Sequence, residues 1–173
     1  MGAAESSSLL LAAVYWLHML ATVAWLGGLA GVALLVLPAA RRTLDAGAYA
    51  AFVGGAQERL QQVGWLSLAV LGVTGMFQMS ASPNYNGFMA IDSPWAAAIL
   101  FKHAAIGLMV LASAYSTWGL LPQMKRAALL RAAGRSVDEE AARRLLARES
   151  TLLRVNLLLS LVVLALTAWA RVS

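Results

Sequence analysis

Four apolar segments, each long enough to cross a lipid bilayer, dominate this sequence and restrict what it can fold into. They cover about residues 8–37, 63–80, 95–121 and 151–170. An α-helix rises ~1.5 Å per residue, so crossing a hydrocarbon layer of ~30 Å takes roughly 20 residues. Residues 63–80 reach that length if the polar helix before them enters the headgroup layer. The pattern predicts a single domain, residues 1–173, that forms an all-α, integral membrane four-helix bundle.

The composition also favours a lipid environment. Of the 173 residues, 61% are hydrophobic and 12% are charged, whereas a soluble domain is roughly 45–50% apolar and about 25% charged. A soluble fold of this length would leave much of that apolar surface in water. We therefore expect the lipid bilayer to be the main partner. The chain lacks cysteine, which excludes disulfides, thiolate metal ligands and iron–sulfur clusters.

The basic residues indicate how the segments are oriented across the membrane. Arginine and lysine concentrate in residues 41–62 and 123–150, while residues 80–94 contain neither. Because basic residues in short loops stay in the cytoplasm, the stretches 41–62 and 123–150 are predicted to be cytoplasmic. Both termini and the loop 80–94 then face outward (N-out/C-out), in a multi-pass protein of the cytoplasmic membrane. The net charge of +5 follows from this topology, so we expect no nucleic-acid partner.

The chain has two histidines, and each lies inside an apolar segment. His18 is ten residues beyond Ser8 and His103 is eight residues beyond Trp95. Both segments are expected to run from the outside inward, which puts both imidazoles roughly 12–15 Å below the outer surface. Ionisable groups at such depth are costly and usually functional. We predict a metal centre shared by His18 and His103, with packing, proton-transfer or hydrogen-bonding roles as the alternatives.

A bis-histidine haem b that serves electron transfer near the outer face is the first hypothesis. Two imidazoles that face each other inside a four-helix bundle can hold haem iron from both sides. Gly28 and Gly107 would leave room for the macrocycle, and Trp25 and Lys102 complete the expected cofactor-binding set. The haem propionates would also need polar partners in the outer loop and the residues that follow it, for which the candidates are Asn84, Tyr85, Asn86 and Ser93.

A copper site is the second hypothesis, because soft thioether ligands select Cu(I). Met76 and Met79 lie three residues apart on one predicted helix face, and Met89 lies in the outer loop. Methionine is also an ordinary gap filler in cores. A third hypothesis is an accessory subunit that packs against other membrane subunits. No Ser–His–acid set is apparent, so we expect an electron-transfer or metal-handling protein that is not an enzyme by itself.

Other polar residues have structural interpretations. We expect Asn156 to make a hydrogen bond between helices, and Glu149 and Arg154 to be solvated charges at the inner boundary. Gly27, Gly28 and Gly31 also fit close helix–helix packing. No internal repeat is evident in the sequence.

Several short motifs resemble those of the CopD-type copper-resistance membrane proteins. The resemblance covers about residues 9–170, and the histidine followed by Trp-x-Gly-Gly is its most distinctive part. The motifs are Tyr15-Trp16-Leu17-His18…Trp25-Leu26-Gly27-Gly28, Arg59-Leu60…Gly75-Met76, Ser93-Pro94-Trp95…Phe101-Lys102…Leu121-Pro122 and Arg154-Val155-Asn156-Leu157…Thr167-Ala168.

This resemblance implies copper handling in the cytoplasmic membrane, with His18 and Lys102 as the residues that carry over. The chain departs from the family pattern at two positions. Asn156 stands where an acidic residue is expected, and His103 stands where an aliphatic one is expected. The extra histidine favours haem over copper. The opening helix is also similar to that of the haem-containing membrane protoporphyrinogen oxidases.

Overall fold

The computed structural model describes residues 3–83, 85, 87 and 91–172, with side chains from residue 8 onward. The candidate ligands Asn84, Asn86 and Met89 lie outside the described residues. Within them, all regular structure is helical. In chain order the elements are α1 (Ala3–Ala30), η1 (Gly31–Val36), α2 (Leu37–Thr43), α3 (Ala46–Ser80), α4 (Pro94–Ala114), η2 (Tyr115–Leu120), α5 (Leu121–Ala132) and α6 (Glu139–Val172), where η marks a π-helical turn.

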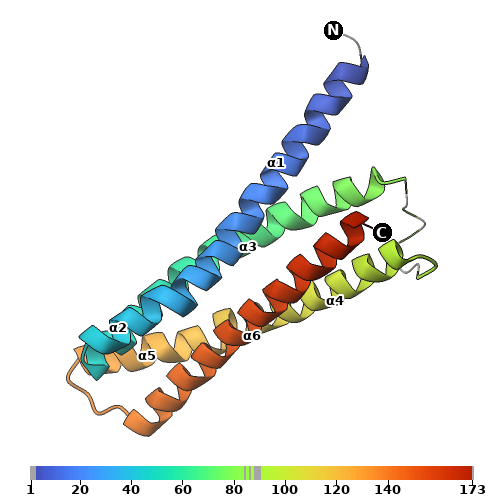
Figure 1. The fold of residues 1–173 in the computed structure, drawn as a ribbon. Coiled ribbons are helices and arrows are strands. Elements are labelled where there is room, and N and C mark those ends of the chain that lie inside the picture. The colour runs from blue at the N-terminus through green and yellow to red at the C-terminus, as the bar shows by residue number, and fades with distance from the viewer. Residues whose placement is uncertain (1–2, 84, 86, 88–90, 173) are drawn as a thin grey trace.

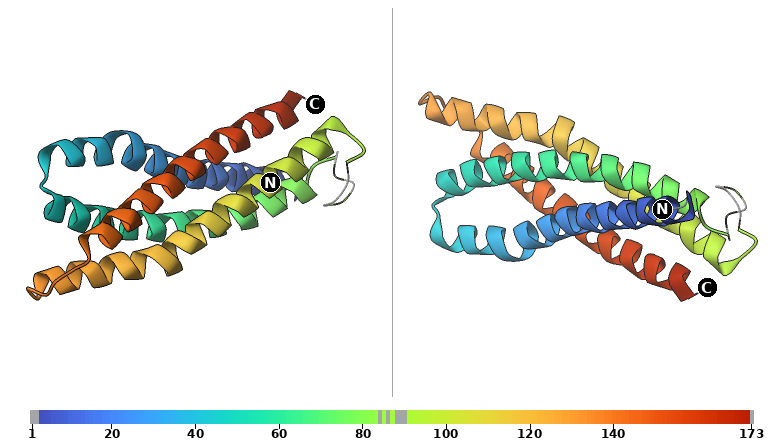
Figure 2. Two further views of the ribbon diagram at one scale, coloured as in Figure 1. Left: turned by 90° about the horizontal axis from the view of Figure 1, so that it is seen from below. Right: turned by 90° about the horizontal axis from the view of Figure 1, so that it is seen from above.

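Four long helical rods in the described part of the chain have the length and composition to cross a membrane: Ser8–Thr43, Ala46–Ser80, Pro94–Ala132 and Glu139–Val172. They form two hairpins, in which α1 packs along α3 and α4 packs along α6 (Figures 1 and 2). The described ends of the chain lie at the same end of the bundle as the α3–α4 connection (Figure 1). The predicted all-α, four-helix membrane bundle is thereby confirmed.

Side-chain caps explain where three of the helices begin. Asp45 Oδ1 accepts 2.9 Å hydrogen bonds from two backbone N–H groups at the start of α3. Asp138 Oδ1 does the same for α6 at 3.0 Å. Ser93 Oγ accepts from the Ala96 N–H of α4 at 3.1 Å, and Pro94 fills the first helical position, where no N–H is needed. Ser93, a candidate partner of the haem propionates, therefore caps a helix.

A π-helical turn interrupts the first and third rods at corresponding places. The Leu37 N–H donates to the Val32 carbonyl, and the Leu121 N–H donates to the Ser116 carbonyl, each five residues back. A proline follows each leucine, and because proline lacks an N–H and crowds the preceding turn, a widened turn is favoured there. Both sites carry the motif Leu-Pro-x-x-basic-Arg, at 37–42 and 121–126. The two hairpins therefore share a local repeat that the sequence analysis missed.

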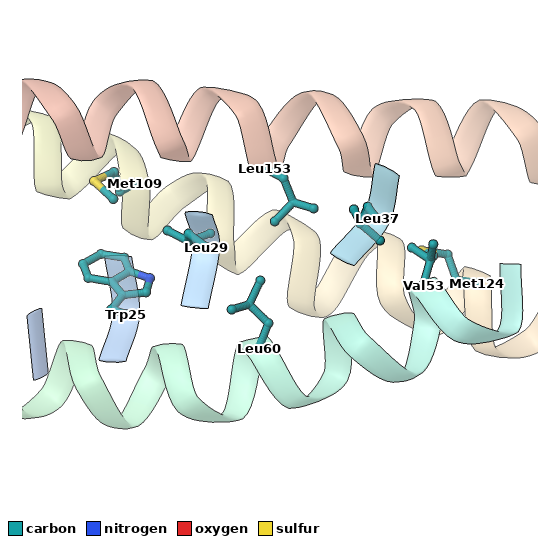
Figure 3. Packing of buried hydrophobic residues seen from close by; sticks show 8 residues of the cluster. All are labelled: Trp25, Leu29, Leu37, Val53, Leu60, Met109, Met124 and Leu153. Atoms are coloured by element: carbon teal, nitrogen blue, oxygen red, sulfur yellow. The ribbon is translucent and has the colours of Figure 1, made fainter. Parts of the chain in front are cut away.

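The hydrophobic core runs as a narrow column between the four rods. Trp25 and Met109 are 5% and 1% exposed and lie near one end of this column. Most large apolar side chains point outward instead; Leu66 and Val73, for example, are 70% and 73% exposed. Such a surface is stable when lipid covers it. The buried cluster drawn in Figure 3 consists of Trp25, Leu29, Leu37, Val53, Leu60, Met109, Met124 and Leu153.

Candidate metal site and an inner polar cluster

His18 is half-buried on α1 and turned toward α3. Its Nδ1 lies 2.8 Å from Thr74 Oγ1, and the same hydroxyl donates to the Val70 carbonyl at 2.6 Å. Because the threonine proton is already used, Thr74 accepts a hydrogen bond from His18 Nδ1–H. The neutral ring then keeps a lone pair on Nε2, the atom that can bind a metal. Metal-binding histidines in proteins are held in this way by an acceptor on the other ring nitrogen.

The His18 ring rests against the backbone of α3 at Gly75. A Cβ built on Gly75 would lie 3.5 Å from His18 Cε1, which is ordinary contact. Met79 is half-buried one helical turn beyond Gly75, on the same face of α3. Gln78 lies one turn beyond Thr74, and its buried Nε2 has no hydrogen-bond partner in the described part of the chain. Met76 is 67% exposed and points away from this face.

Lys102 approaches His18 from the other hairpin. Lys102 on α4 is half-buried, and its positive charge is near enough to act on His18 of α1. Both residues lie nineteen positions before the leucine of their Leu-Pro pair (37 − 18 and 121 − 102). The two residues therefore occupy equivalent positions in the two hairpins.

His103, the second predicted ligand, is half-buried on α4. Its Nδ1 lies 2.7 Å from the Ile99 carbonyl of the same helix. A carbonyl oxygen can only accept, so the His103 proton is on Nδ1, as it is in His18. His18 is hydrogen-bonded to a residue of α3. The helix that carries His103, α4, packs mainly along α6. Over the described residues, histidine, aspartate and glutamate side chains do not gather in a group of three or more that could hold a metal.

The other predicted cofactor-binding residues have packing positions or face outward. Trp25 is 5% exposed within the core, next to Gly64, where a Cβ would lie 3.7 Å from the indole Nε1. Gly28 is in close contact with Leu60, whose Cδ1 would lie 3.2 Å from an added Cβ. Gly107 is on the exposed face of α4, with no described atom within 4 Å of an added Cβ. The close-packing interpretation is therefore correct for Gly28.

A second polar cluster lies deeper in the bundle, on the side of the basic connections. Glu149 is 1% exposed, and both its carboxylate oxygens accept from Ser116 Oγ, at 2.7 and 2.8 Å. Gln57 Nε2 donates to the same Ser116 oxygen at 3.1 Å. The prediction that Glu149 is a solvated charge is therefore wrong. Its spacing from Leu153 and Asn156 places all three on one face of α6, and that face is turned into the bundle.

Asn156 extends this polar cluster to a point two helical turns beyond Glu149 on α6. Its Nδ2 donates to Ser113 Oγ on α4 at 3.2 Å, which confirms the predicted hydrogen bond between helices. Its Oδ1 is buried without a hydrogen-bond partner in the described residues. Arg154 is exposed on the surface of α6.

Comparison with known proteins identifies the family. The family model for copper resistance protein D, CopD, matches residues 54–170, well over half of the chain. This protein belongs to the CopD family. No curated protein and no solved structure matches the chain significantly.

The CopD match includes some of the residues described above and leaves out others. It contains Thr74, Lys102 and Glu149, whereas α1, with His18, lies before its first residue. The helix that carries His18 is nevertheless part of the bundle, because it packs along α3. Thr74 and Gly75 of α3 lie within the matched residues, and they contact the imidazole of His18, which lies before them.

Proposed function

We propose that this CopD-family protein binds copper as cargo within the cytoplasmic membrane, with His18 Nε2 as the anchoring ligand. The observation that carries the proposal is the hydrogen bond from His18 Nδ1 to Thr74. It orients the ring and leaves the Nε2 lone pair for a metal. Imidazole and thioether ligands both suit Cu(I), and the family match points to copper among the metals they can bind.

Met79 is the methionine best placed to complete this site. It lies one turn beyond Gly75, which touches the His18 ring, on the same face of α3. Met76 is largely exposed toward lipid. An imidazole and a thioether on neighbouring helices would provide two soft ligands for Cu(I) without any cysteine.

Lys102 would keep the bound copper exchangeable. Its ammonium group interacts electrostatically with His18, and two like charges repel strongly where the dielectric constant is low. Copper bound at His18 would therefore be held less tightly than at an isolated imidazole–thioether pair. A moderate affinity suits a protein that passes its metal on.

The haem b hypothesis has less support than copper. A macrocycle held between His18 and His103 would need space beside the two helices. Leu60 occupies the space beside Gly28, and Gly107 is on the outer face of α4. Neither glycine offers the interior space that the haem hypothesis assigned to it.

Copper titration of the purified, detergent-solubilised protein tests the proposal. Under reducing conditions, competition with a chromophoric Cu(I) chelator should show binding that His18→Ala abolishes and Met79→Leu weakens. The matched control Met76→Leu should bind copper like the wild type. Sharp visible haem bands in the protein as purified, or unchanged copper binding by His18→Ala, would contradict the proposal. Metal-free protein that copurifies with other membrane subunits would favour an accessory role instead.

A further inference from the structure

The inner polar cluster surrounds a small cavity that the copper proposal does not use. Polar side chains from three of the rods line it: Gln57, Gln61, Ser113, Ser116, Glu149 and Asn156. The cavity has room for a particle of about the size of one water molecule. An organic substrate would therefore not fit, whereas a single small ion would.

The oxygen atoms of this cluster have unused capacity to bind a cation. A carboxylate can accept at about four positions, and Ser116 supplies the hydroxyl donor to both oxygens of Glu149. Asn156 is 6% exposed, and its Oδ1 is buried with no donor among the described residues. Glu149 and Asn156 lie two turns apart on α6 and line the same cavity. Carboxylate and amide oxygens together form a ligand set suited to hard cations.

The charge of the cluster selects the type of cation. Across the described residues, the ion pairs of lysine and arginine involve Glu58, Glu139 and Glu140 and leave out Glu149. A buried carboxylate without a compensating charge is costly. One monovalent cation would neutralise Glu149, whereas a divalent cation would leave an uncompensated positive charge. No histidine or methionine lines the cavity, so it does not offer the soft ligands that Cu(I) prefers.

From this combination of size, donors and charge, we propose that the cavity is a binding site for a monovalent hard cation of the size of Na⁺. The site is separate from the copper site at His18 and does not depend on it. The serine that contacts Glu149 belongs to the π-helical turn η2, and such turns often occur at functional sites. Occupation of the cavity would tie α3, η2 and α6 together through one ion.

Thermal unfolding of the detergent-solubilised protein in NaCl tests this proposal, with choline chloride keeping the ionic strength constant. A ligand that binds only the folded state raises the unfolding midpoint in a saturable way. We expect Na⁺ to raise the wild-type midpoint, and Asn156→Ala to require at least several-fold more Na⁺ for the same rise. Glu149→Gln should lose the response, whereas the exposed control Glu140→Gln should keep it.

Two comparisons make the outcome decisive. His18→Ala should retain the full Na⁺ response, which separates this site from the copper proposal. Equal wild-type midpoints in NaCl and choline chloride would overturn the proposal, whether or not Glu149→Gln folds. A midpoint that changes with pH but not with Na⁺ would also overturn it, because Glu149 would then hold a proton in place of a metal cation.

Discussion

His18 and Lys102 stand at equivalent positions of two similar hairpins, and their side chains interact electrostatically inside the bundle. The hairpins share a long rod, a π-helical turn, a Leu-Pro pair and an aspartate cap on the returning helix. The two residues differ in chemistry, because one offers a lone pair and the other a positive charge. In the copper proposal, this asymmetry within a repeated framework places the anchoring ligand beside a positive charge that repels the metal.

Removing the positive charge at Lys102 should tighten copper binding. We expect Lys102→Gln to raise the Cu(I) affinity about tenfold or more, because a like charge nearby is lost where the effective dielectric constant is about 20. Competition with a Cu(I) chelator measures the change. Lys125→Gln is the control, since Lys125 forms an exposed ion pair with Glu58. An affinity for Lys102→Gln equal to or below that of the wild type would show that the lysine does not oppose the metal.

Removing the acceptor of the His18 hydrogen bond should weaken copper binding while leaving the ligand in place. Thr74→Val keeps the side-chain shape but leaves His18 Nδ1–H unpaired, and we expect an affinity loss of about 10-fold or more. Thr74→Ser should recover most of the wild-type affinity. Thr43→Val is the control, because Thr43 is exposed and bonds to its own helix. Equal copper affinity in Thr74→Val and the wild type would mean that Thr74 does not orient the ligand.

Two adjacent glycines of α1 should respond differently to alanine. Each Gly→Ala change in a helix gains about 1 kcal/mol of helix propensity. At Gly28 the new methyl group would lie 3.2 Å from Leu60 Cδ1, whereas at Gly27 it meets no described atom within 4 Å. We therefore expect Gly27→Ala to unfold at a higher temperature than Gly28→Ala in detergent. The reverse order would show that α1 and α3 pack less closely around Gly28 than the structure indicates.

The N-out/C-out orientation is testable because the chain has no cysteine of its own. A cysteine at Ala81, beyond the end of α3, should react with a membrane-impermeant maleimide in intact cells. A cysteine at Arg135, between α5 and α6, should react only after the membrane is permeabilised. Both positions are exposed, so burial does not complicate the comparison. Labelling of the Arg135→Cys variant in intact cells would reverse the orientation that the basic residues predict.

The features that could be predicted from sequence are those set by neighbours along the chain. Apolar runs of sufficient length become membrane helices wherever they occur, because an unpaired backbone group is costly in lipid. Capping by Asp45 and Asp138, and the widened turns before Pro38 and Pro122, depend on residues within about one turn. The sequence therefore held the information for the repeat, although its motif is short enough to be missed.

The arrangement of the interior was decided by the packing of helices that are distant in sequence. Matching depth along two parallel spans suggested His18 and His103, and this pairing stays a prediction, because depth does not determine rotation about the helix axis and neighbouring residues point about 100° apart. Lys102 is the neighbour that interacts electrostatically with His18, and Thr74 of α3 holds the imidazole. Glu149 follows a run of arginines and was expected in solvent, yet it is buried in the bundle against Ser116 of η2. Local sequence determines that these helices form and cross the membrane, whereas only their mutual packing determines which polar groups lose contact with solvent and meet one another.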